Sequence, residues 1–342
     1  MRAFITGLSG PVLTASERAF LREAEPWGLI LFKRNVTAPE PLRQLIGEVR
    51  AALGRAAPVL IDQEGGRVQR LGPPHWPTYP PGAAYGALYD RDRETGLAAA
   101  KLGARLIAAD LAALGIDVDC MPLADVPVAA ADPVVGDRAY GTDPAKVAAI
   151  AGAIARGLAE EGVLPVVKHI PGHGRATADS HNRLPVVSAD RATLEATDFA
   201  AFRLLAGLPL AMTAHVVFSA IDPIAPATIS GTIVRDVIRD SIGFKGLLLS
   251  DDVSMGALSG SIAERSRAAI AAGCDVVLHC NGGMPEMLAV AAQAPVLAGE
   301  AARRAAAALA SRKPARPIDL TAGRAEFLKL MAGVWQPARG LA

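Results

Sequence analysis

A short stretch of the chain gathers many of the side chains that could transfer protons. Residues 168–174 read Lys-His-Ile-Pro-Gly-His-Gly and residues 179–181 read Asp-Ser-His, so three of the six histidines lie close together. Crowded imidazoles and cations shift one another's pKa values, and such crowding is typical of functional sites. A carboxylate two residues from an imidazole, as in Asp179 and His181, can bond one ring nitrogen and leave the other free for proton transfer.

Two other interpretations of these histidines stay open at this point. His173 lies between two glycines and is equally compatible with a structural role, in which it satisfies backbone groups of its own loop. His169, His173 and His181 could also converge on a zinc ion. The HExxH spacing and the cysteine pair that would strengthen a metal site are both absent from the sequence.

Other polar residues follow directly after short apolar runs, at the positions where buried strands would end. They are Asp62 after run 58–61, Lys168 and His169 after run 164–167, His215 after run 209–213, and Asp251 and Asp252 after run 246–249. If the runs are neighbouring parallel strands, all six side chains should face one pocket at the carboxyl ends of the strands. We interpret Asp252 as a cap or salt-bridge residue. Arg70 and Arg138 lie on long loops, where solvated and functional roles are equally expected.

The apolar runs also predict the fold. Eight runs, most of them followed by helical sequence, occupy residues 3–8, 28–32, 58–61, 116–121, 164–167, 209–213, 246–249 and 275–278. Continuous apolar strands indicate a parallel sheet covered on both faces, and eight of them close into a (β/α)8 TIM barrel of the α/β class. Helices are expected over residues 14–25, 39–53, 94–114, 144–161, 231–241, 284–312 and 325–332. No linker interrupts the units, so we expect one catalytic domain over residues 1–342 with a helical tail from about 314 to 342.

Composition restricts the function further. The 342 residues are 51% hydrophobic and 20% charged, with a net charge of +1, which argues against nucleic acid or acidic membrane surfaces as partners. Three cysteines in apolar runs read as reduced core residues, and no signal peptide or membrane span is evident, so a cytoplasmic protein is expected. We expect no obligate protein partner, and the oligomeric state is not predicted.

The expected pocket suits a neutral polyhydroxy ligand. Carboxylates and cationic donors can bind sugar hydroxyls in bidentate fashion. A strand-end carboxylate at Asp251 and a proton shuttle at His181 are the minimum required for glycoside hydrolysis with retention of configuration. The usual pair is two carboxylates, whereas here the shuttle would be an imidazole. A sugar-binding barrel without turnover and a metal-dependent hydrolase remain the alternatives.

The motifs resemble those of a known enzyme family. Residues 168–174 and 179–181, together with Asp-Gln-Glu-Gly-Gly-Arg-Val at 62–68 and Ser-Asp-Asp-Val-Ser-Met at 250–255, are similar to the bacterial β-N-acetylhexosaminidases of glycoside hydrolase family 3, the NagZ type. The departures are conservative: Ile170 replaces a common phenylalanine, and Val253 a common leucine. Related β-glucosidases carry a second domain that supplies the acid–base residue, and we expect none here.

The resemblance implies a role for each matching residue. Asp251 would be the nucleophile, and His181 the general acid–base, oriented by Asp179. Asp62, Arg70, Arg138, Lys168 and His169 would bind the hydroxyls of a terminal N-acetylglucosamine. No metal or other cofactor is implied.

The resemblance also implies a substrate. It is N-acetylglucosamine β-1,4-linked to anhydro-N-acetylmuramic acid, a muropeptide fragment released in peptidoglycan recycling. Strictness for N-acetylglucosamine over other hexosides is not predicted, so a broader β-glucosidase activity stays open. Phosphorolysis also stays open, because a neutral imidazole does not repel phosphate.

Overall fold

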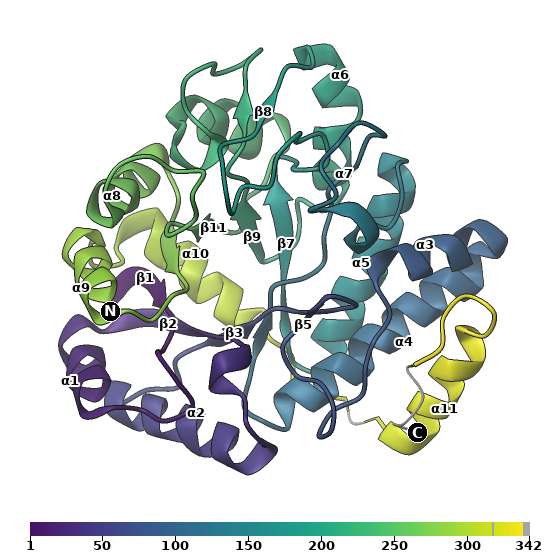
Figure 1. The fold of residues 1–342 in the computed structure, drawn as a ribbon, viewed down its shortest axis with the longest axis horizontal. Helices are drawn as coiled ribbons and strands as arrows, with labels where there is room; N and C mark the ends of the chain where they lie inside the picture. Colours follow the sequence, from purple (N-terminus) through teal and green to yellow (C-terminus); the bar gives the residue numbers. More distant parts are fainter. Residues whose placement is uncertain (317, 338–342) are drawn as a thin grey trace.

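The computed structural model describes residues 1–316 and 318–337, and its centre is a closed barrel of eight parallel strands (Figure 1). The order around the barrel is β1, β2, β3, β6, β7, β9, β11 and β12, after which β12 pairs with β1. The bounds are β1 Arg2–Thr6, β2 Pro26–Leu31, β3 Val59–Ile61, β6 Val118–Asp119, β7 Leu164–Ile170, β9 Leu210–Thr213, β11 Leu247–Asp252 and β12 Val276–His279. The predicted (β/α)8 TIM barrel is confirmed.

The barrel strands are mostly apolar because both of their faces are buried, and the polar residues of β7 and β11 lie towards their carboxyl ends. Successive residues alternate between the interior of the barrel and the layer of helices. In β3, for example, Leu60 belongs to the interior cluster, whereas Val59 and Ile61 pack with the helices. The same alternation in the other strands produces the continuous runs seen in the sequence.

Helices surround the barrel, and two of them begin with recognisable sequence signals. Thr14 caps α1 in a capping box with Glu17, and Pro39 opens α2. The helices are α1 Ala15–Ala24, α2 Pro39–Leu53, α3 Gly82–Arg91, α4 Arg93–Ala112, α5 Pro144–Glu160, α6 Arg191–Ala196, α7 Asp198–Leu204, α8 Ile262–Ala272, α9 Met284–Gln293, α10 Gly299–Ala310 and α11 Leu320–Leu330. Within the described ranges, no helix combines the length and apolar composition required to cross a bilayer.

Short elements complete the fold. Two small sheets lie outside the barrel: β4 (Gln63–Gly65) pairs with β5 (Val68–Gln69), and β8 (Val186–Val187) pairs with β10 (Val217–Phe218). Three 3₁₀ turns, η1 (Lys33–Asn35), η2 (Gly136–Arg138) and η3 (Ala227–Ile229), and the π-helical η4 (Ile233–Ser241) lie in the connections. Several of these elements carry residues of the site described below.

The structure differs from the expected helices in three ways. The helix expected over residues 284–312 is two helices, α9 and α10, separated at Ala294 and Pro295, because proline lacks the amide hydrogen that a helix interior requires. The helix expected over 325–332 begins earlier, at Leu320, where Asp319 caps it. Helices α3, α6, α7 and α8 were not expected at all.

The carboxyl-terminal helices pack on the barrel. Helix α10 closes its amino-terminal opening: Ala305 and Ala308 join the interior cluster, and Arg304 bonds to Asp275 just before β12. Helix α11 lies along α4 (Figure 1), with Phe327 buried. The part of the expected tail at 317 and 338–342 lies outside the described residues.

Candidate active site

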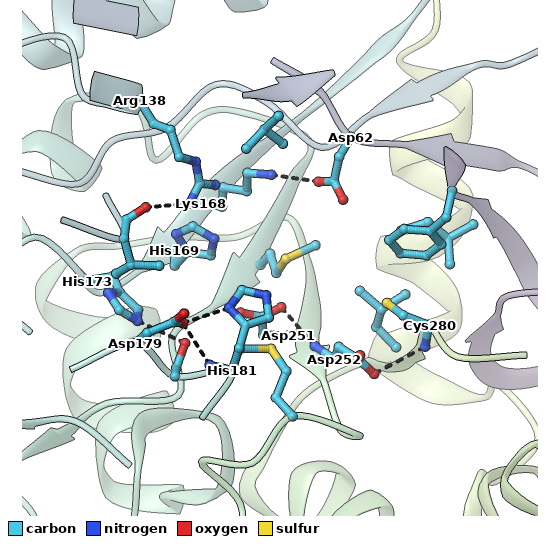
Figure 2. A pocket seen from close by; sticks show the side chains of 18 of the residues that line it. Asp62, Arg138, Lys168, His169, His173, Asp179, His181, Asp251, Asp252 and Cys280 are labelled. Atoms are coloured by element: carbon cyan, nitrogen blue, oxygen red, sulfur yellow. Dashed lines mark hydrogen bonds and ion pairs between the residues drawn. The ribbon is translucent and has the colours of Figure 1, made fainter. Parts of the chain in front are cut away.

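A cavity of about 450 Å³ opens at the carboxyl ends of the barrel strands. Its apolar floor is formed by Ile30, Met212 and Leu278, which belong to the interior cluster of the barrel. Many of its other lining side chains are polar (Figure 2). All eight predicted site residues line it, namely Asp62, Arg70, Arg138, Lys168, His169, Asp179, His181 and Asp251. The structure therefore brings these eight side chains, taken from strand ends and loops far apart in sequence, to one cavity.

Asp251 is the last residue but one of β11 and faces the cavity. Its amide donates to Thr213 Oγ1 (3.2 Å), and its Oδ1 accepts from the amide of Asp252 (2.8 Å). Burial alone would raise the pKa of Asp251, but the imidazoles of His215 and His169 and the Asp252 amide hold it below the usual value of 3.8. A carboxylate that stays ionised at neutral pH inside the cavity is suited to nucleophilic attack.

Asp252 has a structural role, as interpreted from the sequence. Its Oδ1 accepts from the amides of Ser254 (3.0 Å) and Cys280 (3.1 Å), and its Oδ2 accepts from the Ser254 hydroxyl (2.6 Å). These bonds join the turn after β11 to the end of β12. The side chain thereby holds the backbone on which Asp251 is presented.

Asp179 and His181 lie on the loop between β7 and β8, and they form the predicted pair. His181 Nδ1 is 2.7 Å from Asp179 Oδ1, which also accepts from the His181 amide at 2.9 Å. Burial acts to raise the pKa of Asp179, but these bonds lower it overall. The His181 side chain remains 66% exposed, so the ring can exchange protons with a ligand and with water.

His173 anchors this loop to the barrel. Its amide donates to Asp125 Oδ1 (2.7 Å), and its Nε2 lies 3.0 Å from Ser180 Oγ, between the two residues of the pair. Burial and the neighbouring His169 lower the pKa of His173 to about 4, although Asp125 and Asp251 act in the opposite direction. The ring is neutral at pH 7, and the structural interpretation of His173 is supported.

The lowered pKa of His173 makes stability depend on pH in a defined window. The unfolded imidazole titrates near 6.5 and the folded one near 4, so the unfolded state binds more protons between these values. We expect the free energy of unfolding to fall as the pH drops from 6.5 towards 4, by at most about 3 kcal/mol from this group. Urea unfolding at a series of pH values from 7 to 4.5 measures this change in the free energy of unfolding. In His173→Gln the free energy of unfolding should change less steeply with pH than in the wild type. An equal dependence on pH in both proteins contradicts the prediction.

A buried network of charges forms the opposite wall of the cavity. Lys168 Nζ lies 2.8 Å from Asp62 Oδ1 and 2.7 Å from Glu64 Oε1. Arg70 Nη2 bonds to Asp62 Oδ2 (3.1 Å), and Arg138 donates two bonds to Glu64 (2.7 and 2.9 Å). Three cations thus surround two carboxylates. Asp62, Arg138 and Lys168 of this network lie across the cavity from the pair formed by Asp179 and His181, which we call the dyad (Figure 2).

The network keeps its two carboxylates and Lys168 charged. Burial would raise the pKa of both carboxyls, but Lys168 with Arg70 lowers that of Asp62 far below its usual value, and Lys168 with Arg138 lowers that of Glu64 to about 2. Burial acts to lower the pKa of Lys168, which the two carboxylates nevertheless raise. Fixed charges of this kind present hydrogen-bonding groups to a ligand without reorganisation.

Removing Lys168 should destabilise the protein strongly, because two buried carboxylates would lose their shared cation. We expect Lys168→Met to lower the free energy of unfolding by about 3–5 kcal/mol. The control is Lys101→Met: Lys101 is 41% exposed and pairs with Glu160, and its loss should cost less than about 1 kcal/mol. Denaturant titration at pH 7 compares them, and a Lys168→Met protein as stable as the control contradicts the expectation.

Sequence reasoning placed one residue wrongly and missed two. His215 does not line the cavity: it is fully buried, with Nδ1 2.7 Å from Thr228 Oγ1 and Nε2 2.9 Å from the Asp252 carbonyl. Glu64, which pairs with Lys168, follows Asp62 at the two-residue strand period and could have been found from it. Asp125, whose Oδ2 lies 2.8 Å from His169 Nδ1, is on a long loop whose sequence carries no comparable signal.

The three histidines do not converge as a zinc site would require. His169 is bonded to Asp125, His173 to Ser180 and His181 to Asp179. Over residues 1–316 and 318–337, no group of three or more His, Cys, Asp or Glu side chains is placed to hold a metal ion. The side chains instead form hydrogen-bonded pairs suited to proton transfer.

Comparisons with known proteins find related sequences and structures. The family model "Glycosyl hydrolase family 3 N terminal domain" matches residues 11–309. A beta-hexosaminidase of Alkalilimnicola ehrlichii is 40% identical over 279 residues, which cover 80% of this chain and 79% of that protein. Native NagZ from Neisseria gonorrhoeae superposes with a TM-score of 0.84 at 31% identity, covering 97% and 96% of the two chains. The same enzyme in complex with N-trifluoroacetyl-D-glucosamine gives 0.81 at 30%, covering 97% and 98%.

Proposed function

The chain belongs to glycoside hydrolase family 3 and is a β-N-acetylhexosaminidase, and from this premise we propose that it is a retaining exo-β-N-acetylglucosaminidase. One observation carries the proposal. An ionised carboxylate on a barrel strand, Asp251, and a loop-borne imidazole, His181, line the same sugar-sized cavity. Retention requires one group that attacks the anomeric carbon and another that moves the proton.

In the first step, Asp251 attacks the anomeric carbon, and the bond from that carbon to the leaving oxygen breaks. Because Asp179 lies on Nδ1 of His181, Nε2 is the atom that donates the proton to the leaving oxygen. In the second step, Nε2 takes a proton from water, which displaces Asp251 and restores the carboxylate. Two inversions at the anomeric carbon give net retention.

The remaining site residues act on the sugar ring. Asp62, Arg70, Arg138 and Lys168 form one charged wall, and its oxygen and nitrogen atoms suit the hydroxyl groups of a terminal sugar. Asp125 orients His169 through Nδ1, which leaves Nε2 for a ligand in the cavity. The apolar floor suits the C–H face of the ring.

We further propose a muropeptide fragment as the substrate, with N-acetylglucosamine β-1,4-linked to anhydro-N-acetylmuramic acid, and a role in peptidoglycan recycling. The similarity to NagZ supports this assignment. The three free thiols, Cys120, Cys274 and Cys280, support the cytoplasm as its compartment. We propose one catalytic domain that acts without nucleic acid, membrane or an obligate protein partner.

The proposal is tested by comparing p-nitrophenyl N-acetyl-β-glucosaminide with the corresponding glucoside and N-acetylgalactosaminide. We expect the first to be hydrolysed with the highest kcat/KM and to release the β-anomer first, as followed by proton NMR. Release of N-acetylglucosamine from the anhydromuramic disaccharide tests the natural substrate. Initial release of the α-anomer, or a clear preference for the glucoside, contradicts the proposal.

Phosphorolysis is a second candidate for the same site, and the imidazole is the observation that favours it. A neutral imidazole does not repel an anionic acceptor as a carboxylate would, so phosphate could replace water in the second step. Turnover with and without phosphate, with analysis for sugar 1-phosphate, separates the two reactions. Absence of the sugar phosphate ends this alternative.

A further inference from the structure

The loop that carries the dyad is bound to the turn that follows Asp251. The amide of Gly256 donates to the carbonyl of His181 at 3.0 Å, and the amide of Ala257 donates to the carbonyl of Ser180 at 3.1 Å. His181 lies on the loop after β7, and Asp251 lies near the end of β11. Backbone bonds nevertheless join the loop after β7 directly to the turn after β11. We call residues 254–257 the platform.

The platform is held firmly to the barrel. The Met255 amide donates to the carbonyl of Asp252 (3.1 Å), and Arg265 from α8 donates to the carbonyls of Val253 (3.0 Å) and Met255 (3.1 Å). With the side-chain bonds of Asp252, these contacts fix the turn relative to β11 and β12. The platform is therefore a stationary surface against which the dyad loop can be positioned.

Hydrogen bonds within the loop that carries Asp179 and His181 hold it in a compact turn. The Asp179 carbonyl accepts from the amides of Asn182 and Arg183 (both 3.1 Å), which closes a tight turn around His181. His173 ties one side of this turn to the barrel through Ser180. On the side of His181, the loop contacts the platform, and at Pro185 its carbonyl accepts from the amide of Val217 (3.0 Å).

Close approach at the platform depends on Gly256. A Cβ atom at this position would lie 2.8 Å from the His181 carbonyl oxygen and 3.0 Å from that of Asn182. The φ angle of Gly256 lies outside the left-handed region, so alanine can adopt this backbone without strain. The glycine is therefore needed for the approach of the loop and not for the shape of the turn.

We propose that Gly256 is a positioning residue for the acid–base imidazole, because it allows the loop carrying His181 to dock on the platform beside Asp251. The inference rests on the proposed function, in which His181 protonates the leaving oxygen. Docking places the proton donor at a fixed distance from the nucleophile. A side chain at residue 256 lifts the loop away and leaves Asp251 and the sugar-binding wall unchanged.

The test compares Gly256→Ala with Gly207→Ala, a matched change at an exposed loop glycine where a Cβ meets nothing within 4 Å. Both are assayed for kcat/KM, which reports the step that forms the glycosyl-enzyme, with two substrates. Phenyl N-acetyl-β-glucosaminide needs protonation of its leaving group, whereas the 2,4-dinitrophenyl compound does not. For Gly256→Ala we expect kcat/KM to fall about 10- to 100-fold with the phenyl substrate and less than about threefold with the 2,4-dinitrophenyl substrate. Gly207→Ala should match the wild type with both.

His181→Gly separates failure of this inference from failure of the proposed function. If His181→Gly loses activity on both substrates equally, His181 is not the acid, and the acid–base role proposed for it is wrong. If His181→Gly shows the leaving-group dependence and Gly256→Ala does not, the docking inference is overturned. Equal loss of both substrates in Gly256→Ala also overturns it, because general disruption would then explain the variant.

Amide hydrogen exchange in the wild-type protein provides a test that requires no variant to fold. The amides of Gly256 and Ala257 should be protected at least about tenfold relative to the unbonded amides of the neighbouring loop. Exchange at the rate of an open loop would show that docking is not maintained in solution and would overturn the inference. Protection that matches the expectation supports it.

Discussion

Asp251→Ala is expected to lower kcat/KM for p-nitrophenyl N-acetyl-β-glucosaminide by about 10⁴-fold or more. The physical reason is that the covalent intermediate cannot form without an oxygen at this position. The lowered pKa of Asp251 keeps this oxygen ionised in the wild type, and no other carboxylate at the end of β11 is free to replace it: Asp252 is engaged by three hydrogen bonds. Steady-state hydrolysis of the chromogenic substrate measures the effect.

The control for this experiment is Asp236→Ala. Asp236 is a partly exposed aspartate in η4 that pairs with its neighbour Arg235, and its loss should leave turnover unchanged. A fluorinated N-acetylglucosaminyl donor should also trap a covalent sugar on the wild type, and peptide mass spectrometry should locate it on Asp251. Trapping on another residue, or more than one hundredth of wild-type turnover in Asp251→Ala, contradicts the proposed nucleophile. A sugar-binding barrel without turnover predicts no trapped sugar at all.

The barrel was predictable because burial on both faces of a strand leaves a strong local signal. Runs such as 164–167 and 246–249 contain only apolar residues; the first lies within β7, and the second includes the first three residues of β11. Helices without a pronounced apolar stripe left a weaker signal. Helix α8 was missed, although Ser261 and Glu264 form a capping box that the sequence displays. The break between α9 and α10 is likewise marked in the sequence by Pro295.

The candidate site was predictable to the extent that its residues lie at strand ends or in compact motifs. Asp62 directly follows β3, and Lys168 and Asp251 lie near the carboxyl ends of β7 and β11, so the direction of each strand places these side chains. Strand position no longer predicts where a side chain points at residues further from the strand end. Strand β9 ends at Thr213, and His215, two residues later, turns towards Thr228 instead of the cavity.

Contacts between distant segments were beyond the reach of the sequence. Asp125 meets His169 and His173 only because the loop after β6 folds over the end of β7. The approach of Gly256 to His181 likewise joins two loops that are 75 positions apart in the chain. Neither pair has a local pattern, since the partners are brought together by closure of the barrel.

His181→Gly is expected to lower kcat/KM by about 10²- to 10⁴-fold for substrates with poor leaving groups and to have little effect on the 2,4-dinitrophenyl substrate. The imidazole contributes only where a proton must reach the leaving oxygen, so its loss should grow with the basicity of that oxygen. Kinetics across a series of aryl N-acetyl-β-glucosaminides measures this dependence. Azide, which needs no general base, should restore turnover of the dinitrophenyl substrate and give the β-glycosyl azide.

Arg183→Gly is the matched control, because it adds a glycine to the same loop while the imidazole stays in place. Arg183 is exposed, and its side chain makes one long bond (3.5 Å) to the carbonyl of Thr177. If loop flexibility alone explained the loss in His181→Gly, Arg183→Gly would show the same dependence on the leaving group. If the imidazole is the acid–base, the control should stay within about threefold of the wild type across the series. A loss in His181→Gly that is uniform across leaving groups, without azide rescue, would assign the proton transfer to another residue of the cavity.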